Sequence, residues 1–337
     1  MTRRARWWLL GLITAVAVAA ATIYGVGEWL RYQQQSTGPS AVEAETMNGP
    51  VPDDRIVFRN TAFGDGYGHV SWVPIADPAG SRTISGRACD RVDATTKSTI
   101  CLRINRGIGT AFEATIFDST MKAERRWKLS GVPSRTRLSD DSSLVATTAF
   151  VTGHSYARAD FSTETVIRKT GGTSYGNLEK FALVMDGKRV TAADRNLWGV
   201  TFADDDTFFA TAAFGGKAWL VRGDLPDRTL TVIRDGVECP SLSPDGTKIA
   251  YKKKVPGDGG TRWTIGVYSL ADRSDTTLGE ERSVDDQVEW LDDGTLLYGL
   301  PSTETIGDSD VWSIAADAAA QPELFIAHAW SPSVVRK

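Results

Sequence analysis

Residues 239–251, CPSLSPDGTKIAY, decide the fold of this chain. The run that ends at Leu242 predicts one β-strand, and a second strand is predicted to begin at Lys248. Between them stands a Ser-Pro-Asp-Gly turn, in which proline presets φ and glycine accepts a positive φ. The stretch therefore predicts a β-hairpin with a tight turn.

The same unit returns three times in weaker form. Its copies are the segments 138–146 (LSDDSSLVA), 202–210 (FADDDTFFA) and 290–298 (WLDDGTLLY). In register, Asp245 of the best copy corresponds to Asp141, Asp205 and Asp293. Successive turns lie 64, 40 and 48 residues apart. A period in the forties with four short strands per unit is typical of a β-propeller.

The number of blades follows from the length of the repeat region. No long stretch after residue 54 shows helical periodicity, and β-rich runs recur there between Gly, Pro, Asp and Ser. Six blades over residues 55–337 give about 47 residues each. The long interval between Asp141 and Asp205 holds surplus residues, which we place in a loop or extended hairpin around 171–196. The sequence thus predicts an all-β, six-bladed propeller of four-stranded antiparallel blades.

Both ends of the repeat region indicate a closed ring. The C-terminal residues 330–333 (WSPS) align with residues 242–245 (LSPD), so we expect the chain to stop just after an inner strand and its turn. Residues 54–58 (DRIVF) are typical of the second strand of a blade. The C-terminal segment is therefore predicted to complete the first blade, which removes open sheet edges.

Residues 241–254, SLSPDGTKIAYKKK, resemble the repeat of TolB-like, or WD40-like, propellers. The resemblance covers most of residues 55–337 and is strongest over 240–270. The whole chain also resembles membrane-anchored or secreted TolB-like proteins of actinobacterial type. The resemblance implies a propeller that acts through protein contacts in the cell envelope. TolB itself has an N-terminal α/β domain, which an apolar run and a short tether replace here.

The N-terminal residues predict a membrane anchor. Residues 7–27 carry no charge, and as a helix they span about 31 Å, close to the thickness of a hydrocarbon core. We predict a cytoplasmic N-terminus at 1–6, a transmembrane helix or uncleaved signal anchor at 7–29 and a flexible tether at 30–54. Arg3, Arg4 and Arg6 favour a cytoplasmic N-terminus. The alternative is a cleaved signal peptide, with secretion of the remainder; in both cases the propeller lies outside the cytoplasm.

Three acidic residues are the candidate site. Glu238 falls in register with Asp286, and Glu289 lies farther along the same inner strand. Inner strands line the channel of a propeller, so these carboxylates could bind Ca²⁺ near one mouth, as in calcium-dependent propeller lactonases. The alternative is that they are solvated or bind neighbouring backbone groups. We predict no other metal and no cofactor.

Other motifs have plain structural interpretations. Residues 172–176 (GTSYG) match the nucleophile-elbow pattern but lack its strand and helix context. Residues 222–224 (RGD) and 204–206 (DDD) fall at expected turns. Four tryptophans recur at equivalent third-strand positions, which favours packing between blades over carbohydrate stacking: Trp72, Trp219, Trp263 and Trp312.

The three cysteines predict one disulfide bond. A turn centred near Thr95 places Cys89 directly opposite Cys101, within reach of a bond. An extracytoplasmic location supplies oxidising conditions. Cys239 is then a buried thiol.

These features favour a non-catalytic protein. A net charge of −4 argues against binding of nucleic acid. No nucleophile, base and orienting group can be assembled from the sequence. We expect a membrane-tethered propeller, folding as a monomer, that binds or scaffolds an envelope protein or polymer. The alternative function is a Ca²⁺-dependent lactonase or hydrolase that uses Glu238, Asp286 and Glu289.

Overall fold

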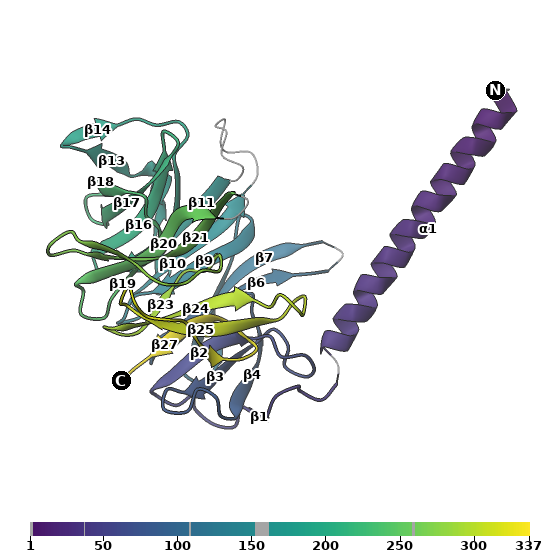
Figure 1. Ribbon diagram of the computed structural model, residues 1–337, viewed down its shortest axis with the longest axis horizontal. Helices are drawn as coiled ribbons and strands as arrows, with labels where there is room; N and C mark the ends of the chain where they lie inside the picture. The colour runs from purple at the N-terminus through teal and green to yellow at the C-terminus, as the bar shows by residue number, and fades with distance from the viewer. Residues whose placement is uncertain (1–2, 37, 108, 152–161, 258–259) are drawn as a thin grey trace.

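The computed structural model describes the chain except for residues 1–2, 37, 108, 152–161 and 258–259. Helix α1 (Arg3–Ser36) stands apart from a body of β-sheets (Figure 1). Its segment Arg4–Leu30 is long and apolar enough to cross a membrane, with a mean hydropathy of 2.1 and no buried residues. An anchor and a signal sequence both have this character.

Six antiparallel sheets surround a central axis, which confirms the predicted six-bladed propeller. Each blade has an inner, a second, a third and an outer strand. The inner strands, in order of blades one to six, are β27 (Ala329–Val335), β5 (Arg91–Ala94), β9 (Val132–Leu138), β15 (Asn196–Phe202), β19 (Glu238–Leu242) and β23 (Glu289–Asp292). Each inner strand contacts the inner strand of the next blade, and β23 contacts β27, so the ring is closed.

The other strands follow in the same order of blades. The second strands are β2 (Arg55–Asn60), β6 (Ser98–Asn105), β10 (Leu144–Val151), β16 (Thr207–Phe214), β20 (Lys248–Gly257) and β24 (Thr295–Pro301). The third strands are β3 (His69–Pro74), β7 (Ala111–Asp118), β11 (Ser162–Lys169), β17 (Lys217–Asp224), β21 (Gly260–Ser269) and β25 (Ser309–Ala315). The outer strands are β4 (Arg82–Ala88), β8 (Ala123–Lys128), β12 (Ser174–Asn177), β18 (Thr229–Asp235), β22 (Asp275–Thr277) and β26 (Glu323–Ile326).

The repeated aspartates lie where the sequence predicts, in the turns between inner and second strands. Asp245 accepts hydrogen bonds from the Thr247 N–H at 3.0 Å and from the Ser243 hydroxyl at 2.5 Å. Asp141 accepts from the Ser143 N–H at 2.8 Å. Asp141 and Asp245 thus each hold their own turn, and the turns between inner and second strands together form one face of the ring, the turn face.

The C-terminal strand closes the first blade, as predicted. Strand β27 pairs with β2 from Ala329 opposite Asn60 to Val335 opposite Arg55. The alignment of residues 330–333 with 242–245 is wrong, because these residues lie within the inner strand and not at its end. Ser331 has a φ of 56° and Cys239 a φ of 50°, each directly before a proline. The Ser331–Pro332 pair therefore corresponds to Cys239–Pro240, at a bulge where proline costs no ladder hydrogen bond.

The surplus residues around 171–196 extend the fourth blade. After β12 and the short 3₁₀ helix η1 (Leu178–Lys180), strands β13 (Ala182–Met185) and β14 (Lys188–Val190) form a hairpin. Strand β13 adds in parallel to β18, so this sheet has six strands. Of the two predicted alternatives for this interval, a loop or an extended hairpin, the structure has the hairpin.

The segment predicted as a flexible tether, 30–54, differs from that expectation. Strand β1 (Ala44–Thr46) pairs in parallel with β4, the outer strand of the first blade. Met47 and Val51 pack against the core cluster between the first two blades. An outer strand leaves backbone N–H and C=O groups unpaired, and this segment pairs with them. The chain is therefore attached to the propeller well before residue 55.

Aromatic side chains on second strands fill the blades. Phe208 and Tyr251 are fully buried and lie opposite Gly223 and Gly266 of the third strands. A Cβ atom added at these glycines would lie 2.1 Å from the Phe208 ring and 2.5 Å from the Tyr251 ring. Glycine is required there because the rings cross directly over the neighbouring strand.

Candidate functional site

Three of the six inner strands share a kink that shapes the central channel. Gly199, Cys239 and Ser331 all have a left-handed backbone, with φ between 50° and 65°. Each stands two residues before a small polar side chain of its own strand: Thr201, Ser241 and Ser333. The kink gives these strands a register shift against their second strands. It places the polar side chains at one level of the channel.

A chain of hydrogen bonds joins neighbouring blades at this level. In four places, a side chain of one inner strand accepts a hydrogen bond from a backbone N–H of the next blade. The pairs are Ala94 N–H to Ser333 at 2.9 Å, Leu138 N–H to Asp93 at 2.6 Å, Leu242 N–H to Thr201 at 3.2 Å and Val334 N–H to Glu289 at 3.1 Å. The channel-facing residues at this level therefore bind the blades to one another.

Arg137 is the central cation of the same level. Its guanidinium contacts Glu289 and lies 3.5 Å from Asp93. Ser333 donates a further hydrogen bond to Asp93 at 2.9 Å. One cation thus joins carboxylates from the second and sixth blades, and all the groups of this network are buried or nearly so.

Burial shifts the pKa values of these groups. Removal from water raises the pKa of Asp93 to about 7, against the attraction of Arg137 and together with the repulsion of Glu289. For Arg137, burial lowers the pKa, but Glu289 and Asp93 more than offset this, so the net shift is upward. Arg137 is therefore charged at any physiological pH, whereas Asp93 titrates near neutrality.

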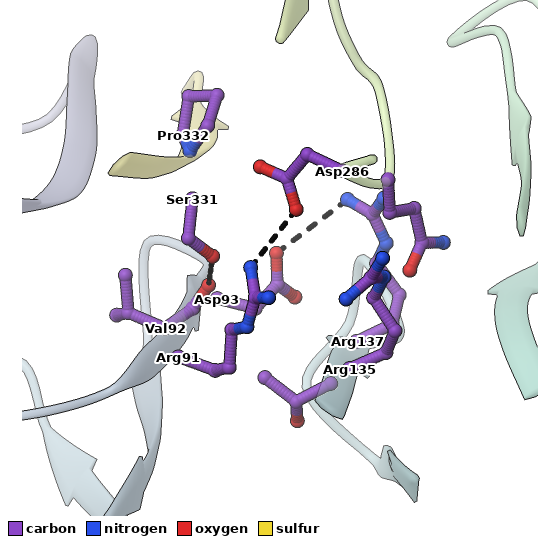
Figure 2. A pocket seen from close by; sticks show the side chains of 10 residues that line it. Arg91, Val92, Asp93, Arg135, Arg137, Asp286, Ser331 and Pro332 are labelled. Atoms are coloured by element: carbon purple, nitrogen blue, oxygen red, sulfur yellow. Dashed lines mark hydrogen bonds and ion pairs between the residues drawn. The ribbon is translucent and has the colours of Figure 1, made fainter. Parts of the chain in front are cut away.

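A second ion pair lies beside this network. The Arg91 guanidinium is 2.9 Å from Asp286, and Figure 2 shows these two side chains meeting in the channel, with Arg135 and Arg137 close by. Burial and the neighbouring Arg135 lower the pKa of Arg91 to about 10. The cavity between these groups measures about 20 Å³, the space of roughly one water molecule. This cavity is therefore too small for an organic substrate.

A larger cavity opens on the face where the second strands end. It measures about 470 Å³, and its lining includes three aromatic side chains: Phe150, Trp198 and Trp263. We call this opening the aromatic mouth and the face around it the aromatic face. Phe150 is 41% exposed there. Apolar surface in a concave site with a few polar groups is typical of a binding pocket.

Several charged side chains of the aromatic mouth form ion pairs, whereas the Arg135 guanidinium donates to the backbone carbonyls of Ser134 and Asp285. Lys252 is 5% exposed; it contacts Asp285, and its ammonium lies 4.9 Å from the centre of the Trp263 ring. The Trp263 indole donates to Glu238 at 3.3 Å, and Lys254 lies 3.7 Å from the same carboxylate. These contacts hold the indole in place over a cationic side chain.

The opposite end of the channel opens on the turn face. This cavity measures about 360 Å³, and polar residues such as Thr201, Ser241 and Ser243 share its lining with apolar ones such as Phe202 and Trp290. The Trp290 indole is used here in an internal hydrogen bond to the Ser241 carbonyl at 2.9 Å. The two mouths offer similar apolar surface, but the aromatic one has much less polar surface, so apolar atoms make up a larger share of its lining.

The structure does not bring the three candidate carboxylates together. Glu238 faces Trp263 and Lys254, Asp286 faces Arg91, and Glu289 faces Arg137. Within the part of the chain that is described, no group of three His, Cys, Asp or Glu side chains has the arrangement of a metal site. Four channel residues were not among those predicted from the sequence: Arg91, Asp93, Arg135 and Arg137. The sequence did contain a signal for Arg137. It stands four residues before the turn aspartate Asp141, and the candidate Glu289 stands four residues before the equivalent Asp293.

The other motifs lie in ordinary positions. Residues 172–176 span the turn between β11 and β12 and the start of β12, residues 222–224 end β17, and Asp204 holds its turn by accepting from the Thr207 N–H at 2.6 Å. Trp72 is buried in the core and Trp219 stacks on Phe214, as expected for packing. Trp263, in contrast, lines the aromatic mouth.

Cys89 and Cys101 are joined by a disulfide, with Cα atoms 5.5 Å apart, and Cys239 is a buried free thiol. The hairpin register predicted for them is wrong, because Cys101 lies opposite Val92 and not opposite Cys89. Cys89 belongs to the connection from β4 to β5, where its N–H donates to the Gly68 carbonyl at 2.9 Å. The bond therefore links the entrance of the second blade to its second strand.

Comparisons with solved structures support the fold. TolB from Acinetobacter baumannii is similar to this chain with a TM-score of 0.55 and 16% sequence identity, over 85% of this chain and 68% of that one. A chain of a nidogen/laminin complex gives a TM-score of 0.50 and 11% identity, over 83% and 97%. A puromycin-hydrolyzing peptidase of Mycobacterium tuberculosis gives 0.46 and 13%, over 87% and 46%.

No family model and no curated protein sequence matches the chain. The structural matches show a TolB-like six-bladed propeller, and at these identities they show the fold alone. Because one fold serves many functions, the function has to be argued from the site.

Proposed function

We propose that this protein is a membrane-tethered propeller that binds a protein or polymer of the cell envelope at its aromatic mouth, without catalysing a reaction. Helix α1 holds it in the cytoplasmic membrane, with the N-terminus inside and the propeller outside. The fold supports a role in protein interaction, as the TolB-like architecture suggests.

The observation that carries the proposal is the combination of exposed aromatic surface and paired charge at this mouth. Phe150, Trp198 and Trp263 supply rigid apolar area in a cavity, which is typical of the anchoring points of interfaces. The nearby cations Lys252 and Arg91 already contact carboxylates. The mouth thus has the surface of a binding site and lacks an evident nucleophile with a base, among the residues described.

Two observations support an extracytoplasmic propeller. Arg4 and Arg6 precede the apolar segment of α1, and basic residues favour the cytoplasmic side. The Cys89–Cys101 bond requires an oxidising compartment, such as the space outside the cytoplasmic membrane.

The experiment is chemical crosslinking on intact spheroplasts with a membrane-impermeant reagent, followed by recovery of the tagged full-length chain. The variant is the double substitution Phe150→Ala and Trp263→Ala. The matched control is Leu324→Ala, which removes an exposed apolar side chain from the outer strand β26.

We expect one crosslinked species that is present with the wild type and the Leu324→Ala control and absent with the mouth variant. Equal recovery from all three proteins would contradict binding at the aromatic mouth. Failure of the reagent to modify the propeller at all would contradict its location outside the cytoplasm.

A further inference from the structure

The N-terminal helix joins the propeller at one defined place. Helix α1 ends at Ser36, and residue 38 already contacts the body: the Gly38 carbonyl accepts a hydrogen bond of 2.8 Å from the Asp65 N–H. Three residues later, the Ala41 N–H donates to the Phe63 carbonyl at 2.9 Å. The first points of attachment are therefore on the loop 61–68, between β2 and β3.

This loop lies on the aromatic face. It follows the end of a second strand, and second strands all run from the turn face to the aromatic face, where Phe150 lies near the end of β10 in the third blade. The neighbouring loop 302–308 also follows a second strand, and the Tyr67 hydroxyl donates to its Gly307 carbonyl at 2.7 Å. We call these two joined loops, 61–68 and 302–308, the anchor rim.

The length of α1 beyond its apolar segment sets the distance of the anchor rim from the membrane. The candidate span ends at Leu30, and the six further residues to Ser36 extend the helix by about 9 Å. The headgroup layer adds roughly 5 to 7 Å to each side of the hydrocarbon core. The end of α1, and with it the anchor rim, therefore lies at the outer boundary of the lipid headgroups.

The anchor rim carries the most exposed large apolar side chain of the propeller among the described residues, Ile306, at 87% exposure. An isolated apolar side chain on a surface needs no explanation by itself. Here it lies on the loop that Tyr67 holds beside the attachment point, on the same side of the body as α1. In Figure 1 the hairpins β6–β7 and β24–β25 project toward the side where α1 stands.

We infer that the anchor rim lies against the lipid headgroups on the outer surface of the membrane that α1 spans, with Ile306 at the contact. The partner is the bilayer itself. The aromatic mouth then opens toward the membrane, and the turn face points away from it. This inference rests on the membrane tether of the proposed function. Asp65 and Glu304 on the rim are exposed carboxylates, so the contact does not depend on anionic lipid.

The test is lipid-attached quenching of a fluorophore on the full-length chain in phosphatidylcholine nanodiscs. Ile306→Cys receives an NBD label, and half of the nanodiscs contain phosphatidylcholine with a nitroxide on its headgroup. The wild-type chain serves as the labelling blank, because Cys239 is buried and the other two cysteines are bonded.

The matched control is Ala271→Cys, an exposed position in the turn between β21 and β22 on the turn face. A seven-residue strand separates the two faces by about 23 Å. We expect strong quenching at position 306 and none at position 271.

Absence of quenching at both positions, with the chain still resistant to extraction by alkaline carbonate, overturns this inference and leaves the tether intact. Stronger quenching at 271 than at 306 also overturns it. Release of the chain from membranes by carbonate contradicts the tether itself, and the inference then fails with it.

Discussion

Ser333 of the last strand donates a hydrogen bond of 2.9 Å to the carboxylate of Asp93, 240 residues earlier in the chain and in the next blade. The same hydroxyl accepts from the Ala94 N–H at 2.9 Å. The C-terminal strand thus does more than complete the first blade. It also links the first blade to the second by hydrogen bonds, and it contributes Ser333 to the buried network of charged groups at the centre of the channel.

The first prediction concerns this closure. Deletion of residues 330–337 removes the part of β27 that pairs with β2, exposes an open edge and strips apolar contacts from Ile56 and Phe58. We expect the free energy of unfolding to fall by several kcal/mol, on the order of a buried strand. Thermal melting of the full chain in detergent measures the loss. Deletion of residues 336–337 alone is the control, and equal melting of the longer deletion and the wild type would contradict the closed ring.

The second prediction concerns pH. The pKa of Asp93 is about 7 in the folded chain and about 4 in the unfolded chain. Between pH 4 and pH 7, the folded chain therefore keeps Asp93 protonated, whereas the unfolded chain has released this proton. The wild type therefore loses stability relative to Asp93→Asn as pH rises from about 4 to about 7, and the difference is constant outside this window. Urea unfolding over this range measures it.

Asparagine at position 93 keeps an oxygen that can accept from the Leu138 N–H. Asp205→Asn, on an exposed turn, is the control for the loss of one carboxylate. A wild type that gains stability relative to Asp93→Asn as pH rises through this window, or a pH-dependent difference of the same size between wild type and Asp205→Asn, would contradict the assignment to Asp93.

The third prediction concerns the disulfide. Mass spectrometry of the non-reduced protein, taken from the envelope, should yield a peptide pair joined through Cys89 and Cys101, with Cys239 as a free thiol. Replacement of both bonded cysteines by serine should lower the free energy of unfolding by about 3 kcal/mol, from the entropy of the short loop. A pairing that includes Cys239, or three free thiols, would refute the bond.

The fourth prediction concerns calcium. Each of Glu238, Asp286 and Glu289 contacts a cationic side chain, so addition of millimolar Ca²⁺ should leave the melting temperature unchanged. Mg²⁺ at the same concentration controls for ionic strength. A rise in the melting temperature with Ca²⁺ alone would favour the alternative of a calcium-dependent hydrolase.

The turn aspartates explain why the fold could be predicted from the sequence. Asp141 and Asp245 stabilise their turns by local hydrogen bonds, as Asp204 and Asp292 do in the other two copies, so the spacing of these turns reports the repeat directly. The repeat and the surplus residues around 171–196 follow from this spacing, and the number of blades follows from the length of the repeat region. The closure was predicted from the segments at both ends of that region.

Other features depend on contacts between distant residues, and the sequence did not reveal them. The dipeptide Ser-Pro occurs both in the turn at Ser243 and at the bulge at Ser331, so the C-terminal alignment was off by four residues. Cys101 lies opposite Val92 and not opposite Cys89. The predicted hairpin included Cys89 in its first strand, whereas Cys89 lies before the start of that strand. The pairing of Arg137 with Asp93 and Glu289 requires three separate blades to be in register.

The central claim is that the aromatic mouth meets an envelope component outside the cytoplasm. A photoreactive phenylalanine analogue at position 150, in living cells, tests it most directly. The same analogue at Ile233, a half-exposed position on the outer strand β18, is the control. The account predicts a discrete crosslinked product from position 150, lost when Trp263→Ala is added, and none from position 233. The same products from both positions, or none from position 150, would contradict it.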